Sequence, residues 1–251
     1  MSFALDDDQK AIRDLARQIF ANTCDKDALD KTEAAGGFFS APAWKALSES
    51  GLVAMSVPEA QNGGGLGLVE QCLVLRQAGE HVAPVPLLES SVVVAPTLAI
   101  FAPPAVTKDR LAALMSGESI ATCALADADS RDPLSPTATA EQVDDGWVLT
   151  GCKPCVPFFD EASSVLVAAT DSAGPGLWLM DLDQQDRRKT ENMGFSQQRA
   201  TDSQPLAQLE LQGTPAVRIG GAVALQFAVT RAMIGRCALA LGVSKMALRL
   251  T

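Results

Sequence analysis

The sequence predicts an α+β fold in three parts: a helical domain over residues 1–117, an antiparallel β domain over 118–218, and the start of a second helical domain over 219–251. Two observations support this division. Apolar residues recur at helical intervals in the first and last parts, whereas the middle part has short apolar or alternating runs of period two. Clusters of Asp, Gly, Pro and Ser separate those runs, which is typical of turns between strands.

The first part is expected to be a series of helices separated by Gly and Pro breaks. Asp6 or Asp7 can cap the first helix, and Ser40 can cap the second, which runs to Gly51. Two helices are therefore expected by residue 51. After a turn from Pro58 to Gly67, three more helices are predicted, over Leu68–Ala78 with Gly79 ending it, Ser90–Phe101, and Thr107–Met115 with its end at Gly117.

Strands are predicted in the middle part over 120–125, 138–143, 146–150, 164–169, 177–182 and 206–211. Asp145-Gly146 is a tight hairpin signal between the second and third of these runs. Gly174-Pro175-Gly176 indicates a further break.

The last part, Ile219 to Thr251, is predicted to be one long helix with four basic residues and no Asp or Glu. Its apolar residues cover most of the circumference, so it needs partners on several sides. No capping signal follows it. We therefore expect either a truncated helical bundle or a bundle that another subunit completes.

Composition narrows the class of partner. Twenty basic and 30 acidic residues give a net charge of −10, which argues against binding to nucleic acid or to an anionic membrane. Asp6, Asp7 and Asp8 stand where a secretory signal would be basic, so a cytoplasmic location is expected. The apolar stretch from Ser91 to Val106 is interrupted by prolines and is too short to span a bilayer, so no membrane span is expected.

Three local features have both a functional and a structural interpretation, and the structural one is favoured for each. Gly63–Gly67 lacks the context of a phosphate-binding loop and is interpreted as a turn. Cys152 and Cys155 lack a second ligand pair, so free thiols in a sheet are expected and no metal site is predicted. His81 is interpreted as a solvated or helix-capping residue.

The order of motifs along the chain resembles the acyl-CoA dehydrogenase family. The matching segments are Gly51-Leu52-Val53, Ser56-Val57-Pro58-Glu59, Gly63-Gly64-Gly65-Leu66-Gly67, Ala78-Gly79-Glu80, Gly117-Glu118, Asp145-Gly146-Trp147-Val148-Leu149-Thr150-Gly151-Cys152-Lys153, Pro215 and Gly220. Each is weak alone, but their order and spacing together are specific, and they run along essentially the whole chain.

The resemblance implies an FAD-dependent oxidoreductase that removes the α-hydrogen of an acyl-CoA thioester as a proton while the β-hydrogen leaves as hydride to the flavin. Family members take the carboxylate base from a C-terminal loop or from the first helix of the bundle. In this sequence the second location falls near Ala232, and the segment from Ile219 to Thr251 has no carboxylate. No catalytic residue is therefore assigned to this chain.

The segments that would contact the flavin also depart from the family pattern. The resemblance assigns cofactor contacts to Leu125 and Ala126, and to Cys155, Val156 and Pro157. Ala126 replaces the Thr that is usual in the family, and Cys155-Val156-Pro157 replaces the usual Trp-Ile-Thr or Trp-Ile-Ser. An aromatic wall, hydroxyl groups and a backbone donor are therefore missing. Ser130 is the candidate residue for binding the CoA part of the substrate.

These losses favour a subunit whose own site is incomplete. The leading hypothesis is that the chain is the non-catalytic partner in an α2β2 heterotetramer, as in actinobacterial enzymes that shorten steroid side chains. The segment Pro84-Val85-Pro86-Leu87-Leu88 is similar to sequences of that group. FAD would be bound mainly by the second acyl-CoA dehydrogenase subunit, and electron-transfer flavoprotein is the expected acceptor in fatty acid β-oxidation or steroid catabolism. Two alternatives remain: a self-sufficient dehydrogenase seen without its C-terminal third, and a binding or scaffold protein without redox activity.

Overall fold

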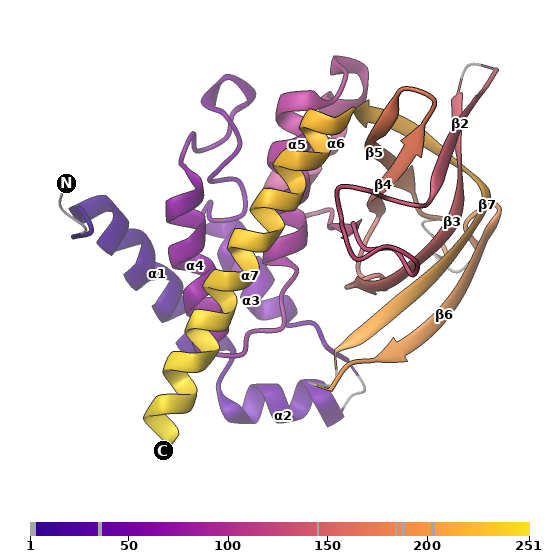
Figure 1. Cartoon of the computed structure of the whole chain (residues 1–251). Helices are drawn as coiled ribbons and strands as arrows, with labels where there is room; N and C mark the ends of the chain where they lie inside the picture. The colour runs from indigo at the N-terminus through magenta and orange to yellow at the C-terminus, as the bar shows by residue number, and fades with distance from the viewer. Residues whose placement is uncertain (1–3, 35–36, 145, 184, 187–188, 202–203) are drawn as a thin grey trace.

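Helices fill the first part of the chain. The computed structural model describes residues 4–34, 37–144, 146–183, 185–186, 189–201 and 204–251. The helical segments before the sheet are α1 Asp7–Thr23, α2 Lys26–Ala34, α3 Ala41–Glu49, the short 3-10 helix η1 Glu59–Gln61, α4 Leu68–Glu80, the π-helix η2 Leu87–Val94, α5 Ala95–Phe101 and α6 Pro104–Ser116. They gather on one side of the molecule, with the β-sheet on the other (Figure 1).

The predicted helix caps are confirmed. The Asp6 side chain accepts a hydrogen bond from the backbone N–H of Gln9, and the Gln9 side chain accepts one from the backbone N–H of Asp6. This reciprocal pair is a capping box. The Ser40 hydroxyl accepts from the N–H of Ala43 at the start of α3. Gly117 ends α6 in the left-handed conformation, with φ of 75°.

Two expectations about these helices were wrong. Helix α2 was not predicted, and the reason is visible in its side chains: none is buried, so the segment carries no apolar stripe. Gly79 does not end α4, which continues to Glu80. A Cβ on Gly79 would lie 2.2 Å from the carbonyl oxygen of Leu239, so this glycine permits close contact with the C-terminal helix rather than a helix stop.

The middle part forms a seven-stranded sheet. Its strands are β1 Ala121–Ala124, β2 Thr139–Val143, β3 Gly146–Pro157, β4 Ser164–Asp171, β5 Gly174–Asp181, β6 Met193–Arg199 and β7 Pro205–Gly220. The pairings β4–β2–β3–β7–β5–β4 close into a ring, with β1 on β4 and β6 on β7. Most pairs are antiparallel as predicted, but β1 and β2 run parallel to β4, which a run of apolar residues does not indicate.

Strand boundaries differ from the prediction in four places, and one of them is β7, which continues past Leu211 to Gly220. Strand β6 was not predicted, because most of its side chains are partly or fully exposed. Strand β3 continues past Thr150 to Pro157, with irregular pairing to β7 and a positive φ of 59° at Cys155. Gly174 and Gly176 lie inside β5 rather than in a break. The predicted Asp145-Gly146 hairpin falls partly outside the described residues, although Val143 does pair with Gly146.

The sheet separates two hydrophobic cores. On β4, Leu166 and Ala168 pack with the helices, whereas Val165 and Val167 pack into the interior of the β domain with Trp178. Both faces of β4 are therefore buried, which explains why its sequence is a continuous apolar run rather than an alternating one.

Helix α7, Ala222–Leu250, follows β7 and confirms the predicted C-terminal helix. It runs diagonally across the helical domain and packs against α4, η2 and β5 (Figure 1). The contact with α4 is close, since a Cβ on Gly242 would lie 2.1 Å from the carbonyl oxygen of Arg76.

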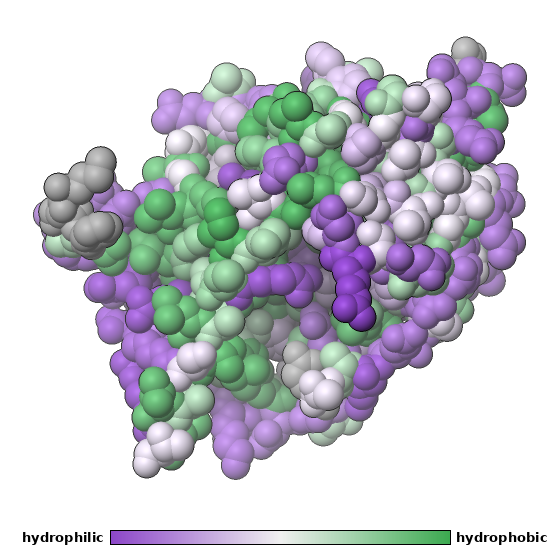
Figure 2. Space-filling model, in the orientation of Figure 1, coloured by the Kyte–Doolittle hydropathy of each residue, from purple (hydrophilic) through white to green (hydrophobic). Residues whose placement is uncertain are grey.

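The outer face of α7 is apolar. Figure 2 shows hydrophobic side chains along its course, and Val223, Ile234, Leu241 and Leu248 are exposed at spacings that place them on one side of the helix. Met233, Val243 and Leu250 are also exposed, and the first two line cavities. By length and composition α7 is apolar enough to cross a membrane, a test that core helices of soluble proteins also pass.

Candidate functional site

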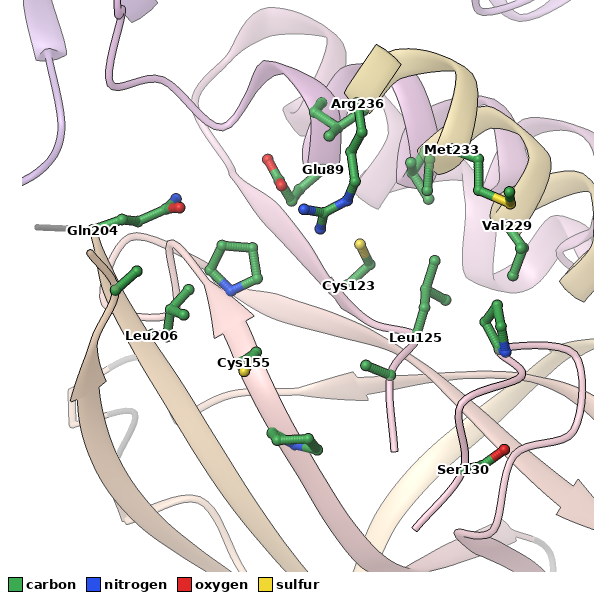
Figure 3. Close-up of a pocket in the computed structure, with 18 of the residues that line it drawn as sticks. Glu89, Cys123, Leu125, Ser130, Cys155, Gln204, Leu206, Val229, Met233 and Arg236 are labelled. Atoms are coloured by element: carbon green, nitrogen blue, oxygen red, sulfur yellow. The ribbon is translucent and has the colours of Figure 1, made fainter. Parts of the chain in front are cut away.

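A cavity of about 550 Å³ lies where the helical domain, the sheet and α7 meet. One wall comes from η2 and α7, and the other from the segment after β1, from β3 and from β7 (Figure 3). The residues that form it are mostly apolar, with Glu89, Ser130, Arg131, Gln204 and Arg236 as the polar members. The same face of the molecule is hollowed between α7 and the β domain (Figure 2).

The structure brings most of the predicted site residues into this cavity. Leu125, Ala126 and Ser130 line it from the segment after β1, and Cys155 and Pro157 line it from β3. Val156 lies between the last two in sequence but is fully buried in the β core, so its side chain does not reach the cavity. Alternation along a strand places neighbouring side chains on opposite faces.

A buried ion pair holds the two cavity-lining segments together. The Lys153 ammonium donates to Asp127 at 2.8 Å, and both side chains are almost fully buried. Asp127 also accepts from the Thr137 hydroxyl and from the N–H of Ala138. Burial lowers the pKa of Lys153, and the hydrogen bond and charge of Asp127 oppose that effect. The pair thus fixes Ala126 relative to Cys155.

Few hydrogen-bonding groups of these segments remain available to a ligand. Ala126 has no hydroxyl, and Pro157 has no N–H. The Pro157 carbonyl already accepts from the Thr122 hydroxyl at 2.6 Å. The Ser130 hydroxyl donates to the carbonyl of Asp132 and accepts from its N–H.

These residues do not fit a flavin ring. The pyrimidine edge of a flavin has several polar atoms, and burying them without partners costs about 1–3 kcal/mol each. Because Ala126 has no hydroxyl and Pro157 has no N–H, the ring contacts expected at these two positions are missing from this chain.

The α7 wall includes the position at which the family resemblance places a catalytic base. Val229, Ala232, Met233 and Arg236 line the cavity there, so the expected position does face the site but carries no carboxylate. The cavity has a carboxylate from another element: Glu89, in the π-helix η2, is 5% exposed. Sequence reasoning missed Glu89; the available signal was a single acid within the apolar run Leu87–Val94.

Burial dominates the electrostatics of this wall. Burial raises the pKa of Glu89, and the positive charge of Arg236 partly offsets this by lowering it. Burial and the nearby charge of Glu89 raise the pKa of the Cys123 thiol to about 12. Cys123 is therefore a packed thiol and not a nucleophile at neutral pH.

The other sequence features take the structural roles expected of them. His81 caps the C-terminus of α4. The N–H groups of Gly64, Gly65 and Leu66 are hydrogen-bonded to the carbonyls of residues 54–57, so they are not directed at a phosphate. Cys152 and Cys155 lie on β3 as unlinked thiols. Among the described residues, no group of three or more His, Cys, Asp or Glu side chains is placed to hold a metal ion.

Comparison with known proteins identifies a family. Residues 6–118 match the acyl-CoA dehydrogenase N-terminal domain. Acyl-CoA dehydrogenase FadE27 of Mycobacterium tuberculosis is 29% identical over 226 residues, which cover 89% of this chain and 57% of that protein. The chain therefore spans just over half the length of this curated relative.

Two solved structures share the fold over nearly the whole chain. A variant of the steroid ACAD Tcur3481-Tcur3483 has a TM-score of 0.88 and 32% identity, over 97% of this chain and 65% of that one. The ChsE4-ChsE5 complex of Mycobacterium tuberculosis has a TM-score of 0.90 and 25% identity, over 100% of this chain and 67% of that one.

Proposed function

Because the chain belongs to the acyl-CoA dehydrogenase family of oxidoreductases, we propose that it is the non-catalytic partner subunit of a heteromeric acyl-CoA dehydrogenase. The complex oxidises an acyl-CoA thioester between its α and β carbons with FAD. The second subunit supplies the base and most of the flavin contacts, in an α2β2 assembly.

One observation carries this proposal: the cavity is present, but the groups that the chemistry needs are absent from its walls. Ala232 stands at the base position without a carboxylate, and Ala126 and Pro157 lack the donors for a flavin ring. General-base catalysis needs a carboxylate within hydrogen-bond reach of the α-hydrogen. Glu89 does not fill this role in the proposal, because it comes from η2 and not from the α7 position or the C-terminal loop that supplies the base in the family. The proposal assigns it to ligand binding instead.

The relatives support a heteromeric assembly. The ChsE4-ChsE5 and Tcur3481-Tcur3483 structures are named as pairs of different chains, and the second is named as a steroid enzyme. We extend both properties to this chain as parts of the proposal, with a steroid side chain as the acyl group. The proposal also includes electron-transfer flavoprotein as the electron acceptor and a cytoplasmic location.

Visible absorption of the purified protein tests the proposal. The chain is purified alone and after co-expression with an acyl-CoA dehydrogenase chain encoded beside it. We expect a colourless protein alone and a yellow complex with about one flavin per chain pair. A matched variant, Ala126→Thr with Pro157→Ser, restores two hydroxyl donors and one backbone N–H and is expected to increase flavin retention by the chain alone.

Two results would contradict the proposal. Stoichiometric flavin on the unmodified chain alone would favour a self-sufficient dehydrogenase. A complex that contains flavin but dehydrogenates no acyl-CoA would favour a scaffold protein without redox activity.

A further inference from the structure

A second cavity adjoins the first. Its volume is about 330 Å³, and it lies between α4, the segment before η2, and α7. The two cavities share Leu88, Glu89, Gln204 and Arg236 as lining residues. These shared residues form a partition between the chambers, and Glu89 and Arg236 are its charged members.

The two charged groups of the partition are not paired with each other. In the described part of the chain no ion pair joins them within 4.0 Å, and neither forms a hydrogen bond to another side chain. Figure 3 shows the Glu89 carboxylate and the Arg236 guanidinium turned toward the same part of the cavity. Glu89 is buried, and its carboxylate accepts a hydrogen bond from its own backbone N–H and lies near the charge of Arg236, which is exposed. Because neither group has a side-chain partner among the described residues, both can still bind a third group between them.

The surroundings define the chemistry of that group. Arg236 and Arg131 line the first cavity with Glu89 as its only acid among the described residues, although the chain as a whole has a net charge of −10. Burial raises the pKa of Glu89 and favours its neutral form, which can donate a hydrogen bond. One guanidinium fork and one acid donor match a monoanionic carboxylate better than a phosphate dianion, which would need further donors.

The second chamber indicates what carries the carboxylate. Its wall includes Leu75, Ala78, Val85, Leu239 and Val243. Among the residues that the structure describes, it has no charged lining residue apart from those of the partition. A chamber of this kind takes an apolar chain or ring system.

We propose that Glu89 and Arg236 bind the carboxylate of an elongated apolar acid whose body occupies the chambers beside them. The guanidinium of Arg236 donates to the carboxylate, and Glu89 donates through its acid proton. The carboxylate belongs either to a free acid or to the distal end of an acyl thioester. Only the second source rests on the proposed function; the site itself does not.

Calorimetric titration of the full chain with octanoate and with octan-1-ol tests the site. The two probes share one alkyl chain and differ in charge. We expect octanoate to bind about tenfold tighter, and Arg236→Gln to abolish that preference, because the neutral glutamine side chain no longer attracts the carboxylate charge. Arg131→Gln, which removes the other arginine of the first cavity, is the matched control and is expected to keep the preference.

A second pair of variants tests Glu89. Glu89→Gln keeps a donor and is expected to bind octanoate within about threefold of the unmodified chain, whereas Glu89→Leu is expected to bind about tenfold more weakly. Thermal unfolding monitored by circular dichroism verifies that each variant is folded. Equal binding of the two probes by the unmodified chain, or equal effects of Arg131→Gln and Arg236→Gln, would overturn the proposal.

Two thioesters identify the source of the carboxylate. Octanoyl-pantetheine is compared with the monothioester of octanedioic acid. Tighter binding of the dicarboxylic thioester, lost in Arg236→Gln, supports the distal end of an acyl group; an octanoate preference without this difference supports a free acid. Neither binding measurement uses flavin. If the carboxylate site is not found, the proposed function is still tested separately by the flavin stoichiometry of the complex.

Discussion

Lys153 illustrates how a single buried residue positions the site. Its ammonium is completely buried and is compensated by Asp127, which joins the segment after β1 to β3. Replacing such a pair by apolar groups is often tolerated, whereas removing one member leaves an uncompensated charge in the interior. The pair therefore matters more for the position of the two segments than as a source of net stability.

We predict that Lys153→Met destabilises the protein by about 3–5 kcal/mol, because Asp127 then remains charged and buried with only the Thr137 and Ala138 donors. Urea denaturation measures the loss. The double variant Asp127→Leu with Lys153→Met is expected to recover part of it.

The surface pair between Lys45 and Glu49 provides the control. Its atoms are 3.7 Å apart, and both side chains are largely exposed. Lys45→Met should change the unfolding free energy by less than about 0.5 kcal/mol. A loss in Lys153→Met no larger than this would show that Asp127 is adequately solvated without its partner.

At the scale of elements, the contact between α4 and α7 unites the helical domain with the C-terminal helix. Gly79 and Gly242 allow the backbones to approach closely. Next to them, Glu80 on α4 is buried and accepts from Lys245 at 2.6 Å, with Arg249 at 3.7 Å and Arg76 at 3.6 Å. The Glu80 carboxylate thus forms ion pairs with three basic side chains at a helix–helix contact.

This contact should make stability depend on pH. Burial by itself raises the pKa of Glu80, but the hydrogen bond and charge of Lys245, with the charge of Arg76, lower it below its ordinary value of 4.5. A lowered folded-state pKa contributes stability that is present above about pH 4.5 and is lost as the pH falls through the folded-state pKa.

We predict that the unmodified chain is more stable than Glu80→Gln at pH 7, and that the difference shrinks as the pH falls below 4.5. Urea denaturation at a series of pH values measures both proteins. A difference that stays constant across this range would mean that the Glu80 charge does not contribute. Glu49→Gln, on the exposed surface pair, is the control and should change the unfolding free energy at pH 7 by less than about 0.5 kcal/mol.

At the scale of the whole molecule, the outer face of α7 carries apolar side chains that the described chain leaves exposed. Leu241 is 55% exposed and Leu248 is 78% exposed, on a helix whose other side is packed. Contiguous exposed apolar surface of this kind marks a contact with a further helix or with another protein. The proposed second subunit would cover it.

We predict that Leu241→Glu with Leu248→Glu abolishes co-purification with the partner subunit, because a buried charge at an apolar interface is unfavourable. The unfolding free energy of the chain alone should change by less than about 0.5 kcal/mol, since both side chains are exposed there. Val143→Glu, an exposed apolar position on β2 in the β domain, is the control and should leave co-purification intact. Unchanged co-purification in the α7 variant would place the interface elsewhere.

Several elements were predictable because their determinants are local. Asp6, Ser40 and Gly117 set helix ends through contacts within one turn, and the apolar period of α7 specified a long helix that needs partners. Helix α2 and strand β6 were not predictable, since neither buries an apolar stripe that would reveal its period.

The sequence by itself determined the resemblance to one family, the division into helical, β and helical parts, and the absence of a carboxylate near Ala232, because each of these depends on residue identity and spacing. Only the tertiary structure decided that Val156 faces the β core and that Gly79 contacts α7 instead of ending α4. It also brought Glu89 of η2 and Arg236 of α7, which are far apart in the sequence, to one cavity. Contacts between residues so far apart in the chain depend on how elements pack, and local spacing carries no record of that packing.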